Sequence, residues 1–336
     1  MPGMQSVLVT GGAGYIGSAL VPALLADGYR VTVYDILYFG ADFLPRDNPN
    51  LKVVKGDIRD AGHFAATCAG HDAVLHLACI SNDASFELDE TLSTSINLDA
   101  FEPMVVAAKT AGVARFIYAS TSSVYGVSDQ PDVTEDHPLV PLTLYNRFKG
   151  MCEPLLLKHT DRDFTGVIFR PATVCGYAPR PRLGLTVNIL TNHAVTNGEI
   201  TVFGGSQLRP NLHVLDYIDL CRLLLSAPSE RIANGIFNCG YQNLSVMEIA
   251  ELVKDVVERI FPDKAPIGIV TKPTDDIRSY HINSDKIRRE LGFSPSRSVE
   301  DAIQGLCKAF SEGKLPNSMT DDWYYNVRHL KRLNAA

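Results

Sequence analysis

Short apolar runs alternate with amphipathic stretches through the first half of the chain. The apolar runs predict buried strands at residues 7–9, 30–35, 51–55, 73–78, 115–120 and 164–170. Between them, apolar residues recur with helical spacing after residue 15 and over 61–68, 92–111 and 145–158. A strand–helix alternation of this kind predicts a parallel sheet with helices on both faces. We therefore expect an α/β protein with a Rossmann-type, doubly wound parallel sheet, whose ligands bind at the carboxyl ends of the strands.

The pattern changes after Pro171. Residues 175–209 are rich in proline, arginine and glycine, and they include an amphipathic helix near 185–197. Residues 210–239 resemble a return to the sheet, with a turn at 213–216 and a helix at 217–225. An amphipathic helix follows at 245–259, where Ser245 and Glu248 have the spacing of a capping box. We expect short elements from there to the aromatic residues at 323–325.

This change divides the chain into two lobes. Residues 1–174 and 210–240 are expected to form the sheet domain, and 175–209 and 241–336 a smaller lobe of mixed α/β structure. Pro22, Pro103 and Pro154 fall inside predicted helices. A proline in a helix interior costs about 3 kcal/mol, so we expect kinks or displaced helix boundaries at these positions.

Three glycines, Gly11, Gly14 and Gly17, interrupt the first strand and open the first helix. Only glycine lets backbone amides approach a pyrophosphate at a sharp turn, and the start of the helix offers free N–H groups to that anion. The second strand ends in Asp35, 18 residues after Gly17, where an acid can accept both hydroxyls of an adenosine ribose. Asp35 would repel a 2′-phosphate, and no arginine follows before Arg46. The sequence therefore predicts a dinucleotide site that prefers NAD.

Tyr145 and Lys149 stand four residues apart, which places them on one face of the helix after the fifth strand. A phenol, with an ordinary pKa of about 10, becomes a usable base when a neighbouring ammonium favours its ionised form. The fifth strand ends in the hydroxyl residues 120–123, at the edge of the sheet where ligands bind. A hydroxyl there can polarise a substrate alcohol and relay its proton to Tyr145.

The amino-acid composition limits the kinds of molecule that this protein is expected to bind. The 336 residues are 46% hydrophobic and 21% charged, as in an ordinary globular protein. A net charge of −7 argues against a nucleic-acid or anionic-membrane surface. No apolar stretch approaches the length of a membrane span, and the first strand begins too early to leave room for a signal peptide. Seven cysteines without metal-ligand spacing indicate reduced, buried thiols, so we expect a cytoplasmic protein without a bound metal.

Together these motifs resemble the NAD-dependent epimerase/dehydratase family of extended short-chain dehydrogenases/reductases, which act on nucleotide sugars. The resemblance extends over essentially the whole chain and rests on residues 10–17, 56–58, 76–78, 119–126, 145, 149, 170–172 and 209–214. It implies an NAD cofactor and a nucleoside diphosphate sugar as the substrate. By position, Thr121 would be the hydroxyl partner of Tyr145. The resemblance and the glycine motif assign the cofactor to Gly11, Gly14, Tyr15, Ile16, Gly17, Asp35, Asp57, Ile58, Leu77, Ala78, Asn97, Lys149 and Pro171.

Two departures from the family pattern narrow the reaction. The family's 4,6-dehydratases carry Asp-Glu directly after the threonine, as the acid and base that expel water, whereas this chain has Ser122 and Ser123. A 3,5-epimerase of the family carries a cysteine at the second of these positions. We therefore expect hydride chemistry at one carbon, most often C4, as in a 4-epimerase, with a net 4-dehydrogenase or 4-ketoreductase as the alternative. The second departure is Asn-Arg-Phe at 146–148, where relatives have small residues, and it leaves the packing of this helix against the cofactor open.

The diphosphate of such a substrate requires guanidinium groups, because their paired N–H donors match phosphate oxygens. Arg209 and Arg278 resemble the family's phosphate contacts, and Arg180 and Arg182 are further candidates. The other residues expected to contact the substrate are Ser81, Asn82, Ser122, Ser123 and Asn188. These residues identify neither the base nor the sugar.

Two other classes of protein are compatible with the sequence. A non-catalytic NAD sensor of the same fold usually lacks the Tyr/Lys pair, which this chain retains. A reductase of steroid-type or flavonoid-type substrates would not need the arginines of the second lobe. The family also implies a homodimer through a four-helix bundle of the helices at 92–111 and 145–159. Its expected apolar surface consists of Phe101, Met104, Val105 and Leu156.

Overall fold

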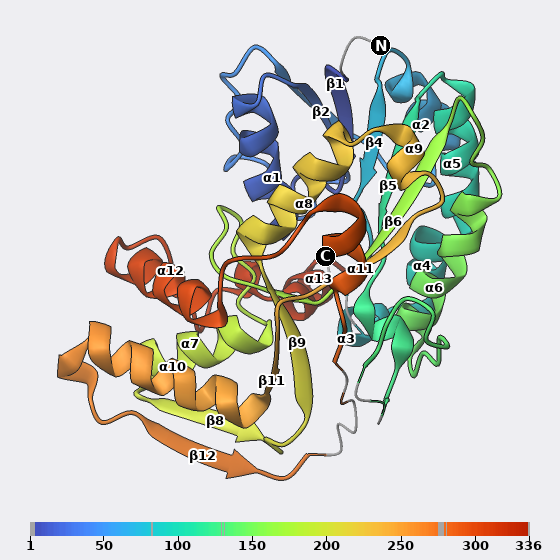
Figure 1. Cartoon of the computed structure of the whole chain (residues 1–336). Coiled ribbons are helices and arrows are strands. Elements are labelled where there is room, and N and C mark those ends of the chain that lie inside the picture. The colour runs from blue at the N-terminus through green and yellow to red at the C-terminus, as the bar shows by residue number, and fades with distance from the viewer. Residues whose placement is uncertain are drawn as a thin grey trace.

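A seven-stranded sheet forms the main layer of the molecule. The computed structural model describes residues 4–334 apart from 82, 129, 131, 275–278 and 280. The strand order is β10-β6-β5-β4-β1-β2-β3, and every pair of neighbours is parallel (Figure 1). The strands are β1 (Ser6–Thr10), β2 (Arg30–Asp35), β3 (Leu51–Lys55), β4 (Ala73–His76), β5 (Arg115–Ala119), β6 (Thr165–Pro171) and β10 (Ile236–Cys239). The predicted doubly wound sheet is confirmed, with the strand order reversing between β1 and β4.

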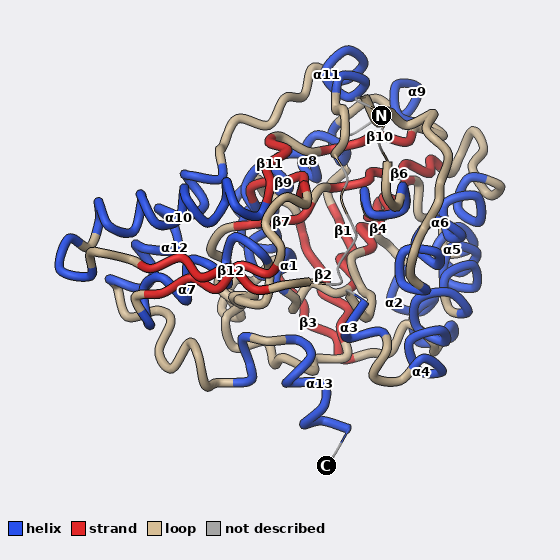
Figure 2. Tube along the Cα trace, turned by 90° about the horizontal axis from the view of Figure 1, so that it is seen from below, coloured by secondary structure: helices blue, strands red, loops and turns tan. Residues whose placement is uncertain are grey.

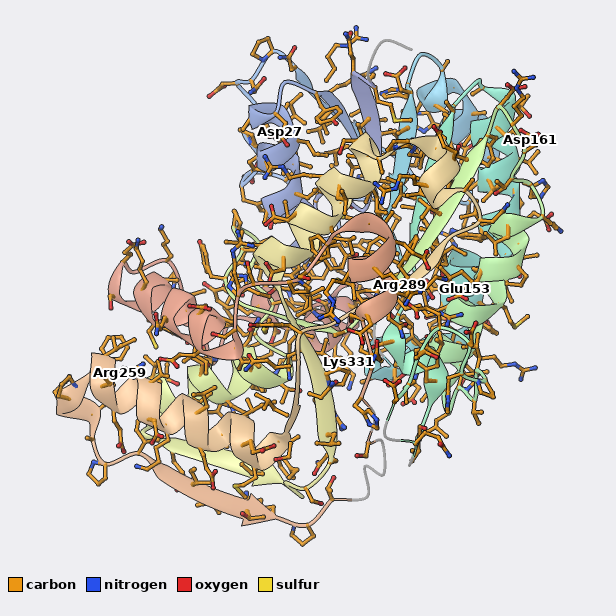
Figure 3. The ribbon with its side chains drawn as sticks, in the orientation of Figure 1. Asp27, Glu153, Asp161, Arg259, Arg289 and Lys331 are labelled. Carbon is orange, nitrogen blue, oxygen red and sulfur yellow. The ribbon has the colours of Figure 1, made fainter. Side chains whose placement is uncertain are left out.

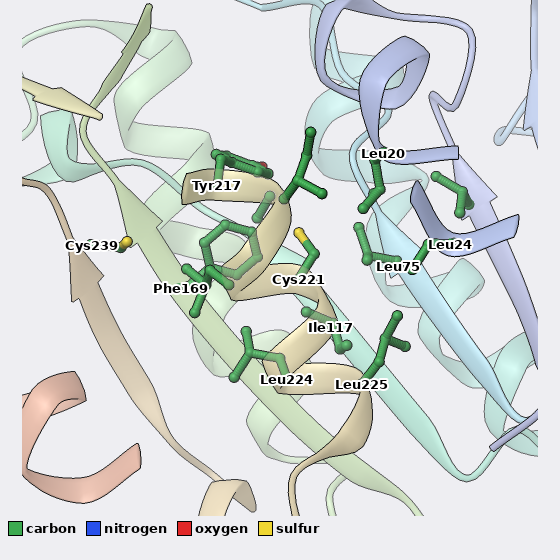
Figure 4. Close-up of a cluster of buried hydrophobic side chains, with 14 of the residues drawn as sticks. Leu20, Leu24, Leu75, Ile117, Phe169, Tyr217, Cys221, Leu224, Leu225 and Cys239 are labelled. Atoms are coloured by element: carbon green, nitrogen blue, oxygen red, sulfur yellow. The ribbon is translucent and has the colours of Figure 1, made fainter. Parts of the chain in front are cut away.

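Helices cover both faces of this sheet. One face carries α1 (Tyr15–Ala26) and α8 (Val214–Ser226), and the other carries α2 (Ala61–Cys68), α5 (Phe101–Thr110) and α6 (Leu144–Leu157). The side chains of β1 alternate between two cores, with Val7 and Val9 beneath α1 and α8 and Leu8 beneath the other three helices. Figure 4 shows the first core, where Leu24 of α1 and Cys221 of α8 pack on the sheet. Because both faces are covered, the strands are apolar almost throughout.

A smaller lobe is built on two further sheets. A three-stranded sheet contains β7 (Thr173–Cys175), β9 (Leu208–His213) and β11 (Gln242–Ser245), and β8 (Glu199–Phe203) pairs in parallel with β12 (Gly268–Lys272). The helices α7 (Thr186–Asn197), α10 (Val246–Ile260) and α12 (Val299–Ser311) pack together and share a core with β8. The capping box predicted at Ser245 and Glu248 is present. The exact division of the chain into 1–174 with 210–240 and 175–209 with 241–336 stays a prediction.

The remaining elements are short. They are α3 (Asp83–Phe86), α4 (Glu90–Thr94), a π-helical turn (Ser95–Asp99), α9 (Ser229–Ile232), α11 (Asp285–Leu291), α13 (Asn326–Asn334) and 3-10 turns over Ser122–Tyr125, Pro262–Lys264 and Asp322–Tyr324. In Figure 2, α13 lies beside α3, so the C-terminal helix returns to the main domain. Within the described part of the chain, no helix has the length and apolar character that a membrane crossing requires.

The helix expected over 92–111 is divided into α4, the π-helical turn and α5. This division places Pro103 in the first turn of α5, where the missing N–H removes no helical hydrogen bond. Pro22 and Pro154 lie inside α1 and α6 and do not displace the boundaries of these helices. The apolar residues expected at a dimer surface are instead buried in the chain's own core: Phe101, Met104, Val105 and Leu156 are at most 1% exposed.

Three further expectations were wrong in the second half of the chain. Residues 213–216 do not form a turn, because His213 ends β9 and its Nδ1 accepts the Leu215 N–H of α8 at 3.0 Å. Of residues 210–239, only β10 joins the main sheet, since β9 belongs to the smaller one. The C-terminal region contains the 13-residue α12 rather than short elements alone.

A buried ion pair ties α6 to the main sheet. Arg170 of β6 donates to Glu153 of α6 through Nε at 3.0 Å and Nη2 at 2.6 Å. The two side chains are only 4% and 3% exposed. Ser120 Oγ donates to the same carboxylate at 2.6 Å, and Arg170 Nη1 donates to Tyr125 Oη at 2.7 Å. Since α6 also carries the predicted catalytic pair, these bonds set the position of that pair relative to the strand ends.

Arg170→Met should lower the free energy of unfolding by about 3–5 kcal/mol, because it leaves the Glu153 carboxylate buried without its partner. Denaturation with urea, followed by circular dichroism, measures the loss, and Arg170→Met/Glu153→Leu should recover most of it. Arg259→Met is the matched control, because Arg259 and Glu300 pair at the surface with side chains 59% and 39% exposed (Figure 3). The control should cost less than about 1 kcal/mol, and equal losses at the two sites would contradict this account.

Candidate active site

A cavity of about 780 Å³ opens at the carboxyl ends of the main-sheet strands, and residues of both lobes line it. Most of the residues predicted from the sequence meet there. They are Gly11, Gly14, Tyr15, Ile16, Asp35, Asp57, Ile58, Leu77, Ala78, Ser81, Thr121, Ser123, Tyr145, Lys149, Pro171, Arg180, Arg182 and Arg209. Asn82 and Arg278 lie outside the described residues.

The glycine turn after β1 allows close packing that a side chain would prevent. Gly11 has a φ of +71°, and a Cβ there would lie 2.7 Å from the backbone nitrogen of Ala78. A Cβ on Gly17 would lie 2.3 Å from the carbonyl oxygen of Gly12, so Gly17 lets α1 approach the turn without lining the cavity itself. Gly14 precedes α1 and no side chain caps that helix. The first N–H groups of α1 therefore remain available to the phosphates of a dinucleotide.

Asp35 and Asp57 occupy the adenosine end of the cavity but differ in their partners. The Asp35 carboxylate accepts the Ala13 N–H at 3.0 Å and the Leu37 N–H at 2.8 Å. Burial raises the pKa of Asp35, although these two bonds favour its ionised form. Asp57 accepts from Arg59 Nε at 3.0 Å, and that bond lowers the pKa of Asp57. Asp35 is therefore the better placed acceptor for the ribose hydroxyls.

Lys149 is held at the inner end of the cavity by a backbone carbonyl. Its Nζ donates to the carbonyl oxygen of Ala119 at 2.8 Å and lies 5.0 Å from the centre of the Tyr118 ring. The Lys149 residue is 5% exposed, whereas Tyr145, one turn earlier on α6, is half-buried and lines the cavity. A carbonyl leaves the ammonium charge uncompensated, so Lys149 can favour a phenolate at Tyr145.

A chain of hydroxyls continues this wall of the cavity. Thr121 Oγ1 and Ser123 Oγ lie 2.8 Å apart, and Ser123 Oγ donates to Asn146 Oδ1 at 2.6 Å. Ser123 has a single hydroxyl proton, so Thr121 is the donor in the first of these bonds. Asn146, whose packing the sequence left open, thus ends the hydroxyl chain and fixes its direction.

Three arginines of the second lobe reach the cavity. Arg182 Nη1 donates to Ser81 Oγ at 3.0 Å, and burial lowers the pKa of Arg182. Arg209 lines the cavity and donates through Nη1 to the Leu208 carbonyl oxygen at 2.9 Å. Arg180 is 1% exposed and lines the cavity as well. Together they concentrate positive charge in a chain whose net charge is −7.

Three residues predicted to contact a ligand lie behind the cavity lining instead. Asn97 binds the N–H and the carbonyl oxygen of Ile80, each at 2.9 Å. Asn188 accepts the Gly176 N–H and donates to the Arg182 carbonyl oxygen, again at 2.9 Å each. Ser122 is 1% exposed in its 3-10 turn and does not line the cavity. Asn97 and Asn188 therefore hold the backbone segments that carry the lining residues.

Sequence reasoning missed the lining residues Tyr38, Phe39 and Asn326. Tyr38 and Phe39 follow Asp35 without belonging to a recognised motif. Asn326 begins α13 and reaches the cavity from the far end of the chain, where its Nδ2 lies 3.3 Å from Ser81 Oγ. No local signal in the sequence could have placed Asn326 in this site.

Residues 7–240 match the model of the NAD dependent epimerase/dehydratase family, and the chain belongs to this family. A dTDP-glucose 4,6-dehydratase of Streptomyces griseus is 30% identical over 308 residues, which cover 88% of this chain and 91% of that protein. A solved dTDP-glucose 4,6-dehydratase of Streptomyces venezuelae, with NAD bound, aligns with a TM-score of 0.81 and 26% identity over 91% of this chain and 97% of that one. The UDP-glucose 4-epimerase of Thermotoga maritima, solved with UDP-glucose, aligns with a TM-score of 0.82 and 25% identity over 92% and 99%.

The family and the cavity agree on the cofactor. The family is NAD-dependent, and the glycine turn, the open start of α1 and Asp35 fit the pyrophosphate and the ribose of that dinucleotide. The chain is therefore an NAD-dependent enzyme of the nucleotide-sugar epimerase/dehydratase family, with both epimerases and 4,6-dehydratases among its relatives.

NAD should bind at least about tenfold more tightly than NADP, because the Asp35 carboxylate repels a 2′-phosphate. Titration calorimetry with both nucleotides measures the difference in affinity between NAD and NADP. Asp35→Asn should make this difference smaller. Burial raises the pKa of Asp35, so the carboxylate is lost on acidification at a higher pH than an ordinary aspartate. The preference for NAD should therefore decrease as the pH falls through the raised pKa of Asp35. Equal affinities at neutral pH would refute this role of Asp35.

Proposed function

We propose that the chain is a nucleotide-sugar 4-epimerase that moves a hydride at C4 of a sugar linked to a nucleoside diphosphate. The observation that carries this proposal is the inner wall of the cavity. Tyr145 and Lys149 line it together with the hydroxyls of Thr121 and Ser123, and the 3-10 turn beside them bears no carboxyl group. This set of groups can move one proton and position one alcohol, which is what oxidation and reduction at a single carbon require.

Bound NAD would accept the hydride from C4 and return it. Tyr145 takes the proton of the C4 hydroxyl, while the Lys149 ammonium stabilises the phenolate that accepts it. Thr121 directs its own proton to Ser123, so its oxygen keeps a lone pair for a hydroxyl at the reacting carbon. Inversion at C4 also requires that the keto sugar presents its other face before the hydride returns.

Elimination of water needs an acid and a base next to the reacting carbons, and the positions that hold them in the family's dehydratases are serines here. Ser122 is buried behind the cavity lining, and Ser123 donates its proton to Asn146. Of the lining carboxyls, Asp35 and Asp57 lie at the ends of β2 and β3, while Asp83 of α3 accepts a hydrogen bond from Thr143 Oγ1 at 2.5 Å, before the start of α6. This arrangement favours an epimerase over a 4,6-dehydratase.

The proposed substrate is a nucleoside diphosphate sugar bound from the second lobe. Arg182 and Arg209 line the cavity on that side and supply the bidentate donors that a diphosphate prefers. Ser81, which accepts from Arg182, lies where it can meet a sugar hydroxyl. The UDP-glucose bound by the Thermotoga maritima epimerase is a substrate of this chemical class.

Incubation with UDP-glucose, UDP-glucuronic acid and dTDP-glucose, each with NAD, tests the proposal. A 4-epimerase should yield from one of them a C4 stereoisomer of unchanged mass, detected by chromatography and NMR, without accumulation of NADH. A product lighter by one water would show a dehydratase, and NADH formed in proportion to product would show a net dehydrogenase. Tight NAD binding without turnover of any nucleotide sugar would indicate a sensor, and each of these three results contradicts the proposal.

Tyr145→Phe should lower turnover by roughly 10²–10⁴-fold and leave NAD bound, because general-base catalysis contributes that much. Lys149→Ala should reduce both turnover and NAD affinity, since the ammonium serves the phenolate and the cofactor ribose. Thr121→Val should cost less, because it removes only a positioning hydroxyl. The wild-type rate should rise through an apparent pKa below about 10, and this rise should vanish in Tyr145→Phe. A near-normal rate in Tyr145→Phe would show that another group takes the proton.

We also propose a homodimer through the outer faces of α5 and α6. Val106 of α5 and Met151 of α6 are 43% and 42% exposed, and they offer apolar surface on these two helices. Light scattering at micromolar concentrations should give the mass of a dimer. Val106→Glu/Met151→Glu should shift it to the monomer, and a wild-type protein that is monomeric throughout would refute the dimer.

A further inference from the structure

Arg180 reaches the cavity from the loop between β7 and α7 and contacts three segments of the nucleotide-binding side. Its backbone N–H donates to Ser18 Oγ of α1 at 3.0 Å. Its Cζ lies 3.6 Å from the centre of the Phe39 ring, in the segment that follows β2. Its Nη2 donates to Asn326 Oδ1 of α13 at 2.7 Å. These contacts place the guanidinium on the segment after β2 and the Arg180 backbone against α1, and both elements receive a dinucleotide.

The charge of Arg180 is buried without a direct ion pair, although the Asp35 carboxylate attracts it. The residue is 1% exposed, its Nε has no hydrogen-bond partner, and no ion pair joins it to a carboxylate of the described residues. Burial lowers the pKa of Arg180 to about 9, repulsion from the neighbouring Arg182 acts in the same direction, and attraction to the Asp35 carboxylate opposes both without cancelling them. A buried cation in this condition is costly unless an anion reaches it. Since Arg180 lines the cavity, a ligand in the cavity can supply that anion.

Arg182, two residues further on, differs in its contacts. Its guanidinium donates to the side chain and the carbonyl oxygen of Ser81 and interacts electrostatically with Tyr145. Arg182 therefore faces the reacting end of the cavity, whereas Arg180 lies over Phe39 and near Asp35, at the end of β2. The two arginines of this loop therefore point to different parts of the cavity. We do not expect both of them to bind the substrate.

We propose that Arg180 binds the diphosphate of the cofactor and closes the dinucleotide site from the second lobe. The start of α1, which no side chain caps, presents its N–H groups to the same anion. Asp35 holds the ribose end of this site, so the guanidinium adds no selectivity for a 2′-phosphate there. Arg180 is thereby assigned to the cofactor, although the sequence indicated the substrate.

The C-terminal segment holds this arginine in place. Trp323 Nε1 donates to the carbonyl oxygen of Phe39 at 3.0 Å, and the His329 ring stacks on the Phe39 ring at 4.7 Å. Asn326 binds the guanidinium directly. The end of the chain therefore fixes both the aromatic ring beneath Arg180 and one of its N–H donors.

Titration calorimetry with NAD, NADP, ADP, adenosine and UDP tests the assignment. Arg180→Met keeps an apolar stem beside Phe39 and removes the charge. It should weaken NAD and ADP binding by about 10- to 100-fold, as expected for a lost charge-assisted contact, and leave adenosine binding unchanged. Arg182→Met, the matched control in the same loop, should leave NAD affinity nearly unchanged. Arg180→Lys keeps a charge and should retain more NAD affinity than Arg180→Met.

The same measurements contain the results that would overturn the proposal. Unchanged NAD affinity in Arg180→Met would refute it, and equal losses for NAD and adenosine would reduce Arg180 to a packing role. Loss of UDP affinity with NAD unaffected would return Arg180 to the substrate, and a larger loss for NADP than for NAD would assign it to a 2′-phosphate. Asn326→Asp provides a test without removing Arg180. A carboxylate beside the guanidinium should compete with the diphosphate and weaken NAD binding, and unaltered or tighter binding would also refute the proposal.

Discussion

The buried pair of Arg170 and Glu153 fixes α6 against β6, and the chemistry of the cavity depends on that position. Lys149 lies one turn before Glu153 on α6, and its bond to the carbonyl oxygen of Ala119 at the end of β5 requires the helix to keep its place along the strands. Desolvation of both charges means that such a pair adds little net stability compared with apolar residues of similar size. Its contribution is a defined position, because α6 cannot slide or turn without leaving a charge buried and unpaired.

The second constraint is the contact between the turn after β1 and its surroundings. A side chain on Gly11 would collide with the backbone of Ala78, and one on Gly17 would collide with Gly12. The cofactor cradle therefore exists only because β1, α1 and the segment after β4 approach more closely than side chains permit. Arg170 and Glu153 lie outside the cavity lining, whereas Lys149 and the glycine turn line it, and the parallel strands β1, β4, β5 and β6 set the distance between these two.

The sequence predicted the parallel sheet and placed the glycine turn, Tyr145 and Lys149 at its carboxyl ends, because the signals for these features are local. Buried parallel strands appear as short apolar runs, glycines mark the turn, and a four-residue spacing marks Tyr145 with Lys149. The predicted contact residues that do not line the cavity have side chains whose direction depends on distant packing. Asn97, Asn188 and Ser122 are polar and buried, and their sequence context is the same whether they face a ligand or a neighbouring backbone. Phe39 and Asn326 meet across nearly the whole length of the chain, so no local pattern could pair them with Arg180.

The electrostatics of the cavity connects the fold to its function. The chain carries a net charge of −7, yet Arg180, Arg182 and Lys149 line a single space, and among the described residues none of the three forms an ion pair with a carboxylate, although Asp35 attracts Arg180. A core built only for stability would avoid such an arrangement, since each uncompensated cation lowers the stability of the empty protein. Anionic ligands remove this cost when they bind, and ligands that bind only the folded state stabilise it in turn. The same positive charges that weaken the unliganded fold therefore favour the binding of anionic ligands in the cavity.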